Sequence, residues 1–512
     1  MSGTARESGG VTARQAGRGG LAIAAAKLYF IAVGLVQQVA LGKILGLEDY
    51  GALSRVQSAA SMAYNPIVTT GVQGVSRAVS GASEADRPAA TRRALVTQAG
   101  GVVPVAIAFF VAAPWISGAM NAPHLTLALR IVSGVLFFYG LYTPLVGVLN
   151  GEKRFLAQAG IDALFATLRT LALLGGAYFF AKRDLGVEGA LGAFVVAAGL
   201  ILLVALPLAG TGSRGTGGPT ARQHLAFVAP LLFGQIALNL LMQSDLQLLG
   251  RFAADAAVAT GLSAREADKL TGAYRAAQLF CFLPYQLLLS VTFVLFPLLA
   301  SAAREGDREA VGRYVATGVR LALVLGGLIV SVSAAIPERL LTLVFTREFA
   351  DLGGRAMFVL ALGLGAFAIF GILASVLTSL GRERESAALT VAALALVVAL
   401  SFTLVRGQPF GKDMLTRTAL AATLALTLAA VLAASAVRRA AGQVVARRTL
   451  LTVALSMVAA ILVGRSVDAA AGASRFMAIP LAGAVALAYL AMLALTGELG
   501  PKDWRLARGV VR

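Results

Sequence analysis

Residues 186–209 read GVEGALGAFVVAAGLILLVALPLA, a run in which Glu188 is the only charged residue. A helix that crosses the hydrocarbon core of a bilayer needs about 20 consecutive apolar residues, so this run predicts a membrane-spanning helix. Similar runs recur from Leu21 to Thr496. The sequence therefore predicts an all-α polytopic membrane protein.

Composition agrees with this fold class, because 58% of the 512 residues are hydrophobic, more than a soluble domain usually carries. Short polar loops separate fourteen apolar runs. The fourteen predicted transmembrane helices span residues 21–45, 51–79, 93–119, 125–149, 155–181, 186–209, 223–250, 270–302, 314–336, 353–380, 385–405, 414–437, 449–465 and 475–497.

An internal repeat organises these helices. Gly51-Ala52 aligns with Gly272-Ala273, and residues 149–154 align with residues 379–384 at a slightly larger offset. The two matches predict two pseudo-symmetric six-helix lobes followed by two further helices. Six is an even number, so the lobes share one orientation, as in parallel-repeat transporters, and we expect a substrate between them.

The corresponding domain boundaries follow from the helices. The predicted segments are a cytoplasmic N-terminal segment at 1–20, an N-lobe at 21–209, a cytoplasmic linker at 210–222, a C-lobe at 223–437, accessory helices at 449–497 and a cytoplasmic tail at 498–512.

The formal net charge of +19 does not indicate a nucleic-acid-binding protein, because the cations sit mostly at alternate helix ends. With the N-terminus inside, we count about 24 Lys and Arg in cytoplasmic segments and about 13 in external ones. This bias predicts an inner (plasma) membrane protein with both termini in the cytoplasm. The basic N-terminal segment leads into an apolar run that is too long for a secretory signal, so we expect the first helix to be retained.

Motifs for catalysis and cofactor binding are missing from the sequence. It contains no P-loop, GxSxG or HExxH motif, so it predicts neither an enzyme nor an ATP-driven pump. Cys281 is the only cysteine, and His124 and His224 lie at opposite helix ends without a carboxylate or cysteine cluster. We therefore expect no disulfide, no metal site and no cofactor.

Polar residues at helical spacing indicate which helices face a cavity. Ser54, Ser58, Ser61 and Asn65 share one face of the second helix, because they are spaced i, i+4, i+7, i+11. Gln235, Asn239 and Gln243 likewise share one face of the seventh helix, and Tyr274, Gln278 and Tyr285 share one face of the eighth. Lys27 and Gln38, eleven residues apart, lie on nearly the same face of the first helix. Such residues can simply bond helices to one another. Their recurrence on repeat-related helix pairs favours a water-filled cavity.

Charges inside a membrane cost roughly 2.5–3.5 kcal/mol each on insertion scales, so each requires an explanation. Lys43, Arg251 and Arg275 lie near external helix ends, where long side chains can extend to the interface. Lys27 and Arg55 lie on polar-faced helices. Asp162 and Arg169 share a helix face, which leaves open a structural ion pair, and Asp245 is either an ion-coupling carboxylate or the counter-charge of a nearby arginine.

Local sequences resemble a known family. Leu41-Gly42-Lys43-Ile44-Leu45-Gly46-Leu47-Glu48-Asp49-Tyr50-Gly51 is similar to a signature of polysaccharide and lipid-linked oligosaccharide flippases, a branch of the multidrug/oligosaccharidyl-lipid/polysaccharide exporter superfamily. Further matches follow in family order over about the first 430 residues. They are residues 71–77, 244–250, 271–274, Phe296-Pro297 and the segment from Leu340 to Arg384.

Two departures refine the resemblance. The family usually has Arg after the seventh-helix Asp, whereas Leu246 follows Asp245 here, so Arg251 or Arg275 would have to substitute. Two extra C-terminal helices are similar to those of lipid II flippases, but Gln37 and Gln38 stand where those proteins carry an arginine pair in the first helix. The resemblance therefore favours a polysaccharide-unit flippase over a lipid II flippase.

The resemblance implies alternating access, with a sugar-pyrophosphate head in the cavity and a polyprenyl tail left in the lipid. The implied partners are the lipid-linked oligosaccharide, membrane lipids and a polysaccharide polymerase machinery. Two other classes stay open: a drug or cation antiporter, which would need an acidic cavity, and a non-transport scaffold with dry, mutually bonded polar stripes. The expected substrate-binding residues are Lys27, Gln38, Arg55, Ser58, Asn65, Gln235, Asn239, Arg275 and Gln278, with Asp245 as the ion-coupling candidate.

Overall fold

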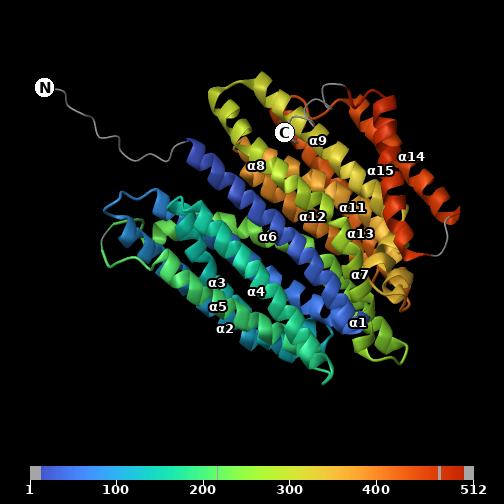
Figure 1. Ribbon diagram of the computed structural model, residues 1–512, viewed down its shortest axis with the longest axis horizontal. Helices are drawn as coiled ribbons and strands as arrows, with labels where there is room; N and C mark the ends of the chain where they lie inside the picture. The colour runs from blue at the N-terminus through green and yellow to red at the C-terminus, as the bar shows by residue number, and fades with distance from the viewer. Residues whose placement is uncertain (1–12, 216, 471–473, 501–512) are drawn as a thin grey trace. The chain divides into compact units, whose positions relative to one another are not determined.

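A computed structural model describes residues 13–215, 217–470 and 474–500, and every regular element in these ranges is helical (Figure 1). Of the predicted terminal segments, residues 1–12 and 501–512 lie outside the described residues, whereas residues 13–20 form the beginning of α1. The α-helices are α1 (Ala13–Ser80), α2 (Arg87–Ala119), α3 (Thr126–Gly151), α4 (Phe155–Ala181), α5 (Gly186–Ala209), α6 (Ala221–Ala259), α7 (Ala267–Cys281), α8 (Leu283–Glu305), α9 (Arg308–Ala335), α10 (Pro337–Val344), α11 (Arg347–Ser379), α12 (Glu383–Leu404), α13 (Lys412–Ala441), α14 (Arg447–Ala470) and α15 (Ala478–Leu495). Three short 3₁₀ helices are η1 (Pro123–Leu125), η2 (Ala264–Glu266) and η3 (Arg475–Met477). The predicted all-α fold class is confirmed.

Twelve helices of the described residues are long and apolar enough to cross a membrane, by length and composition. One of them, Ala25–Ser80, is 56 residues long and covers the second predicted span and the first from residue 25 onward. The eighth predicted span, 270–302, is divided between α7 and α8 and is not among the twelve. The chain is a multi-pass membrane protein.

Two breaks in the helices have local causes. Gly46 inside α1 has φ 72° and ψ −177°, a conformation that L side chains rarely adopt, so this glycine permits the sharp kink between the two predicted spans. Between α7 and α8, Pro284 stands in the first turn of α8. Proline has no backbone N–H and restricts the residue before it, so the predicted continuous helix ends at Cys281 and a new one begins at Leu283.

The chain forms two compact units. Unit 1 comprises residues 1–40, 63–113 and 127–235, and unit 2 comprises residues 41–62, 114–126 and 236–512. Residues 41–62 of α1 thus pack with the C-terminal half of the chain. The six-helix lobe boundaries drawn from the sequence stay a prediction.

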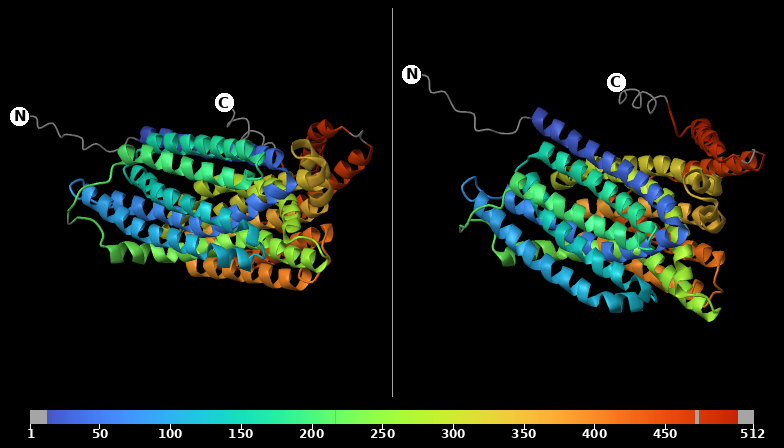
Figure 2. Two further views of the ribbon diagram at one scale, coloured as in Figure 1. Left: turned by 90° about the horizontal axis from the view of Figure 1, so that it is seen from below. Right: turned by 60° about the horizontal axis from the view of Figure 1, so that its bottom comes forward.

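Helices of unit 1 pack closely through glycines. The helices between residues 87 and 209 run alongside one another in all views (Figures 1 and 2). A side chain at Gly147 of α3 would lie 2.8 Å from the carbonyl oxygen of Val72, and one at Gly151 would lie 2.8 Å from that of Ser76. This small-residue spacing lets the backbones of α3 and α1 approach, as at helix interfaces in membranes.

In unit 2 the two C-terminal helices pack on α9. The Tyr489 hydroxyl of α15 donates to the Val324 carbonyl at 3.0 Å, and Gly464 of α14 lies against Ala335. Arg339 of α10 pairs with Asp468 of α14. These contacts fix α14 and α15 to the rest of unit 2.

The repeat predicted from the sequence has a counterpart in the contact of α1 with α7. A side chain at Gly51 would lie 1.8 Å from the Asp268 carbonyl oxygen, and one at Gly272 would lie 2.3 Å from the Leu47 carbonyl oxygen. Gly51 thus contacts Asp268, which is four positions before its repeat partner Gly272. In the same way, Gly272 contacts Leu47, which is four positions before Gly51. Such reciprocity is what a two-fold axis produces where it passes between related elements.

Candidate functional site

The predicted site residues are divided between the two units. Unit 1 holds Lys27, Gln38, Asn65 and Gln235. Unit 2 holds Arg55, Ser58, Asn239, Asp245, Arg275 and Gln278. Each group therefore has its own surroundings.

Unit 1 encloses a cavity of about 730 Å³ among α1, α3 and α4. Of the predicted site residues, only Lys27 lines it. Arg77 is the second cation, and Asp162 is the one carboxylate of the lining. The other polar lining residues are Thr69, Gln73, Ser76, Ser80, Tyr139, Tyr142, Thr143, Asn150 and Gln158.

A chain of hydrogen bonds orders one wall of this unit 1 cavity. Ser76 of α1 donates to the Asn150 side-chain oxygen at 2.7 Å, and the Asn150 amide donates to the Gln158 oxygen of α4 at 2.9 Å. The close approach at Gly147 and Gly151 brings Asn150 to Ser76, and the short turn after Gly151 brings Gln158 to Asn150. The wall presents amide and hydroxyl groups, which suit sugar hydroxyls.

Aromatic rings form another wall. Tyr139 stacks on Phe165 with centroids 4.8 Å apart and on Tyr142 at 5.8 Å. Phe30 also lines the cavity. Rigid rings beside amides and cations give a surface on which a sugar ring can pack while its hydroxyls are bonded.

The predicted relation between Asp162 and Arg169 is not what the structure shows. Lys27 is the cation whose charge acts on Asp162, across two helices of unit 1. Arg169 instead lies over the Phe30 ring, with its guanidinium carbon 4.4 Å from the ring centre. Helical spacing placed both residues on one face, but the neighbouring helix α1 determines their partners.

Gln37 and Gln38 replace the arginine pair expected in lipid II flippases. Gln37 is buried and accepts a hydrogen bond from Thr170 at 3.0 Å, whereas Gln38 is half-buried. The Gln37 side chain therefore bonds α1 to α4. A substrate role for Gln38 stays a prediction, as it does for the half-buried Asn65 and Gln235.

Unit 2 contains a buried cluster around Asp245. This carboxylate accepts hydrogen bonds from the Tyr274 hydroxyl at 2.8 Å, the Gln278 amide at 3.1 Å and the Leu246 backbone N–H at 2.8 Å. Arg275 donates to the Gln278 oxygen at 3.2 Å. Asp245 and Gln278 are buried, as are Asn239 and Ser58, two further predicted site residues of unit 2. The ion-coupling role of Asp245 and the substrate roles of the other four stay predictions.

A second buried cluster of unit 2 surrounds Arg55. Its guanidinium donates to Asp268 at 2.8 Å and to the Met120 carbonyl at 2.5 Å, and both charged side chains have 0% exposure. His124 lies 2.7 Å from the other Asp268 oxygen. Arg55 thus joins α1 to α7 and to the turn at Met120 that follows α2, and a substrate contact would require the pair with Asp268 to open.

Two further ion pairs of unit 2 join η2 to α1. Arg265 of η2 pairs with Glu48 at 2.5 Å and with Asp49 at 3.0 Å. Burial lowers the pKa of Arg265, but the carboxylates of Glu48 and Asp49 raise it by more, so the net shift is upward. The acidic residues after Gly46 are therefore the partners of Arg265.

Several residues that the structure places in these sites were not predicted from the sequence. Asp268 gave no periodic signal, Gln73 follows the polar stripe of the second predicted helix without belonging to it, and Tyr139 and Tyr142 lie on α3, where no polar stripe was identified. Asn150 and Gln158 flank the turn at 151–154, and their eight-residue separation across that turn is the signal that could have identified the pair.

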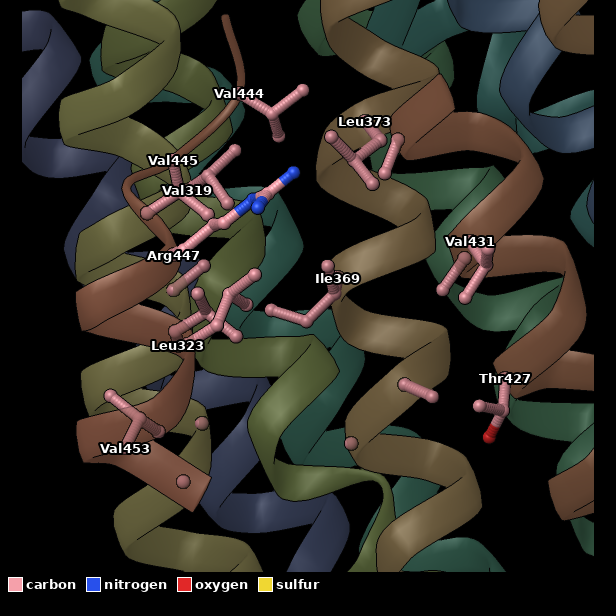
Figure 3. A pocket seen from close by; sticks show the side chains of 18 of the residues that line it. Val319, Leu323, Ile369, Leu373, Thr427, Val431, Val444, Val445, Arg447 and Val453 are labelled. Atoms are coloured by element: carbon pink, nitrogen blue, oxygen red, sulfur yellow. The ribbon is translucent and has the colours of Figure 1, made fainter. Parts of the chain in front are cut away.

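An apolar groove of about 680 Å³ lies elsewhere in unit 2, lined by α9, α11, α13 and α14 (Figure 3). Val319, Leu323, Ile369 and Leu373 line it, and Arg447 reaches into it beside Val444 and Val445. Its chemistry suits an aliphatic chain rather than a sugar. Within the described residues, no group of three or more His, Cys, Asp or Glu side chains could hold a metal ion.

Solved structures share this fold. A lipid II flippase, MurJ, in an inward closed conformation has a TM-score of 0.72 and 13% identity, covering 96% of this chain and 100% of that one. An inward-facing multidrug resistance MATE family transporter of the MOP superfamily has a TM-score of 0.65 and 15% identity, covering 80% and 94%. A MOP superfamily transporter from Pyrococcus furiosus, described as having a binding pocket of reverse polarity that suggests a different function, has a TM-score of 0.61 and 15% identity, covering 83% and 96%.

These likenesses establish the fold, which is that of transporters and flippases. No curated protein matches the chain in sequence. The family described as polysaccharide biosynthesis protein matches residues 16–303, more than half of the 512 residues. Because the match covers more than half of the chain, the chain belongs to the polysaccharide biosynthesis protein family.

Proposed function

We propose that this protein is a flippase that moves a polyprenyl-pyrophosphate-linked oligosaccharide from the inner to the outer leaflet for surface polysaccharide synthesis. Family membership supports the substrate class. The observation that carries the proposal is the unit 1 cavity, where Lys27 and Arg77 lie beside an amide wall and an aromatic wall. Cations offset pyrophosphate charge, and amides and hydroxyls bond sugars.

The lipid part of the substrate needs a different environment. A polyprenyl tail is apolar, so in this mechanism it stays in lipid while the head enters the protein. Translocation then requires only that the protein bind the head differently in inward- and outward-open states. Asp245, the one carboxylate of its buried cluster, is the residue we propose for coupling to an ion gradient.

Lipid II is the second candidate substrate, because the MurJ likeness extends over 96% of the chain and so includes the C-terminal helices. A cationic drug is a poorer candidate. The unit 1 cavity is lined by two cations and one carboxylate, whereas a cationic ligand favours an acidic, aromatic site.

We further propose that the protein resides in the bacterial inner membrane with both termini in the cytoplasm, next to a polysaccharide polymerase machinery. The Lys and Arg bias supports this orientation. Reporters fused after Arg512 and near Gly215 should then lie in the cytoplasm, and one near Ser263 should lie outside. An external signal at the C-terminus would contradict the predicted topology.

Deletion of the gene tests the proposed substrate. The expected result is accumulation of a polyprenyl-pyrophosphate-linked surface-polysaccharide unit in the inner leaflet, identified by mass spectrometry of extracted lipids. Accumulation of the peptidoglycan precursor instead would establish the second candidate. Unchanged levels of both lipids would contradict a flippase function.

A further inference from the structure

A second hollow in unit 1 lies apart from the cavity assigned to the substrate head. It has a volume of about 580 Å³ and is formed where α2 begins, α5 ends and α6 begins. The two hollows have no lining residue in common. The second is lined by Arg92, Arg93, Val96, Thr97, Ser213, Arg214, Gly215, Thr220 and Ala221.

The segment after α5 is folded onto α2, although its glycine content predicts a flexible linker. Ser213 donates its backbone N–H to the Pro88 carbonyl at 3.1 Å. A side chain at Gly212, with φ +69°, would lie 2.1 Å from that carbonyl, and one at Gly218, with φ +85°, would lie 2.5 Å from Ala90. Only glycine permits this packing, which holds Arg214 at the hollow shared with Arg92 and Arg93.

Three guanidinium groups thus line one hollow without a carboxylate in the lining. Within the described residues, none of the three has a hydrogen-bond or ion-pair partner for its guanidinium. Asp86, which directly precedes α2, packs against Gly217 and accepts a hydrogen bond from Ser83 at 2.8 Å, and it does not line the hollow. Like charges gathered in this way repel, so an anion among them would be stabilising.

The start of α6 adds to the positive potential. Thr220 and Gln223 form a reciprocal cap, in which the Thr220 N–H donates to Gln223 at 2.9 Å and the Gln223 N–H donates to Thr220 at 3.3 Å. The cap fixes the first turn of a 39-residue helix whose amino end carries partial positive charge. The Thr220 and Thr97 side chains place hydroxyl groups at the same hollow.

We propose that this hollow, the arginine pocket of Arg92, Arg93 and Arg214, binds a phosphate group. Arginine bonds phosphate oxygens in pairs and is the side chain best suited to that geometry. On the predicted topology the pocket faces the cytoplasmic leaflet, where basic pockets between helices bind the headgroups of anionic lipids. The phosphate belongs either to such a headgroup or to a soluble phosphate compound, and the two sources share this chemistry.

The test uses the full chain in nanodiscs and compares two triple variants. The pocket variant carries Arg92→Ala, Arg93→Ala and Arg214→Ala. The control variant carries Arg304→Ala, Arg308→Ala and Arg384→Ala, which removes the same charge from exposed positions of unit 2 that line none of the hollows described above. Native mass spectrometry measures retained phosphatidylglycerol against phosphatidylcholine, and a parallel titration uses inorganic phosphate and pyrophosphate.

The pocket variant should retain phosphatidylglycerol at least about tenfold more weakly than wild type, while the control variant resembles wild type. Retention that phosphate cannot displace would identify a lipid headgroup as the source. Phosphate binding that competes with lipid and is lost in the pocket variant would identify a soluble compound. Equal binding by all three proteins, or equal loss in both variants, would overturn the proposal. Because these guanidiniums have no partners, thermal unfolding of the pocket variant should match or exceed that of wild type.

Discussion

Unit 1 arranges polar side chains around a cavity, whereas unit 2 bonds its own polar side chains to one another. In unit 1, Lys27 and Arg77 face a hollow of about 730 Å³. In unit 2, Arg55 and Asp268 are fully buried against each other. The contrast shows that a polar stripe on a membrane helix has two uses, to line water or to join helices, and that the surroundings decide between them.

The largest effect should come from breaking the buried pair of unit 2. Arg55→Ala removes the buried cation beside Asp268 and leaves His124 as its remaining side-chain partner; breaking a buried ion pair in this way typically costs about 3–5 kcal/mol. We expect a strongly lowered unfolding temperature in detergent and little protein in the membrane. Lys27→Ala removes a charge from the unit 1 cavity and should leave both nearly unchanged. Equal stability of the Arg55 and Lys27 variants would contradict the view that unit 2 uses its polar side chains to join helices while unit 1 uses them to line a cavity.

A smaller effect should follow from removing one hydrogen bond in the Asp245 cluster. Tyr274→Phe deletes the donor at 2.8 Å from Asp245, and a bond to a carboxylate contributes about 1.5–3 kcal/mol. Tyr285→Phe is the matched control, because this tyrosine is on the same predicted helix face but its hydroxyl has no hydrogen-bond partner within the described residues. Thermal unfolding should be lowered for the first variant only. A similar loss in both would mean that ring packing, and not the bond, stabilises the cluster.

The subtlest difference is accessibility to water. In a Cys281→Ala background, Gln73→Cys and Ser80→Cys should react with hydrophilic thiol reagents, since both exposed side chains line the unit 1 cavity. Ser58→Cys and Gln278→Cys should be inert, since the native side chains are 3% and 1% exposed. Rapid labelling at Gln278 would show that the unit 2 cluster opens to water in another conformation, as the sequence analysis expected.

The sequence predicted the helices well because their signal is local. The length of each apolar run predicts a membrane-spanning helix, and Gly46 within Leu45-Gly46-Leu47-Glu48-Asp49 marks the first kink. The break at Phe282 was missed because apolar content continues across it, although Pro284 was a visible cause.

The site was predicted less completely for a physical reason. Periodicity shows that Ser58 and Gln278 each lie on the polar face of a helix, but not whether that face meets water or another helix. Pairs such as Arg55 with Asp268, 213 positions apart, depend on tertiary packing that no local pattern encodes. Lys27 was identified because a lysine two turns inside a helix end already needs an explanation.

The central claim is that the unit 1 cavity holds the pyrophosphate head, and translocation in proteoliposomes tests it most directly. Outward movement of a lipid-linked oligosaccharide, normalised to inserted protein, should fall roughly ten- to a hundredfold in Lys27→Ala and in Arg77→Ala, and further in the double variant, since each lost phosphate contact contributes about 1.5–3 kcal/mol. Lys27→Arg should retain much of the activity, because charge is kept. Unchanged translocation in the folded double variant would contradict the assignment of this cavity to the substrate.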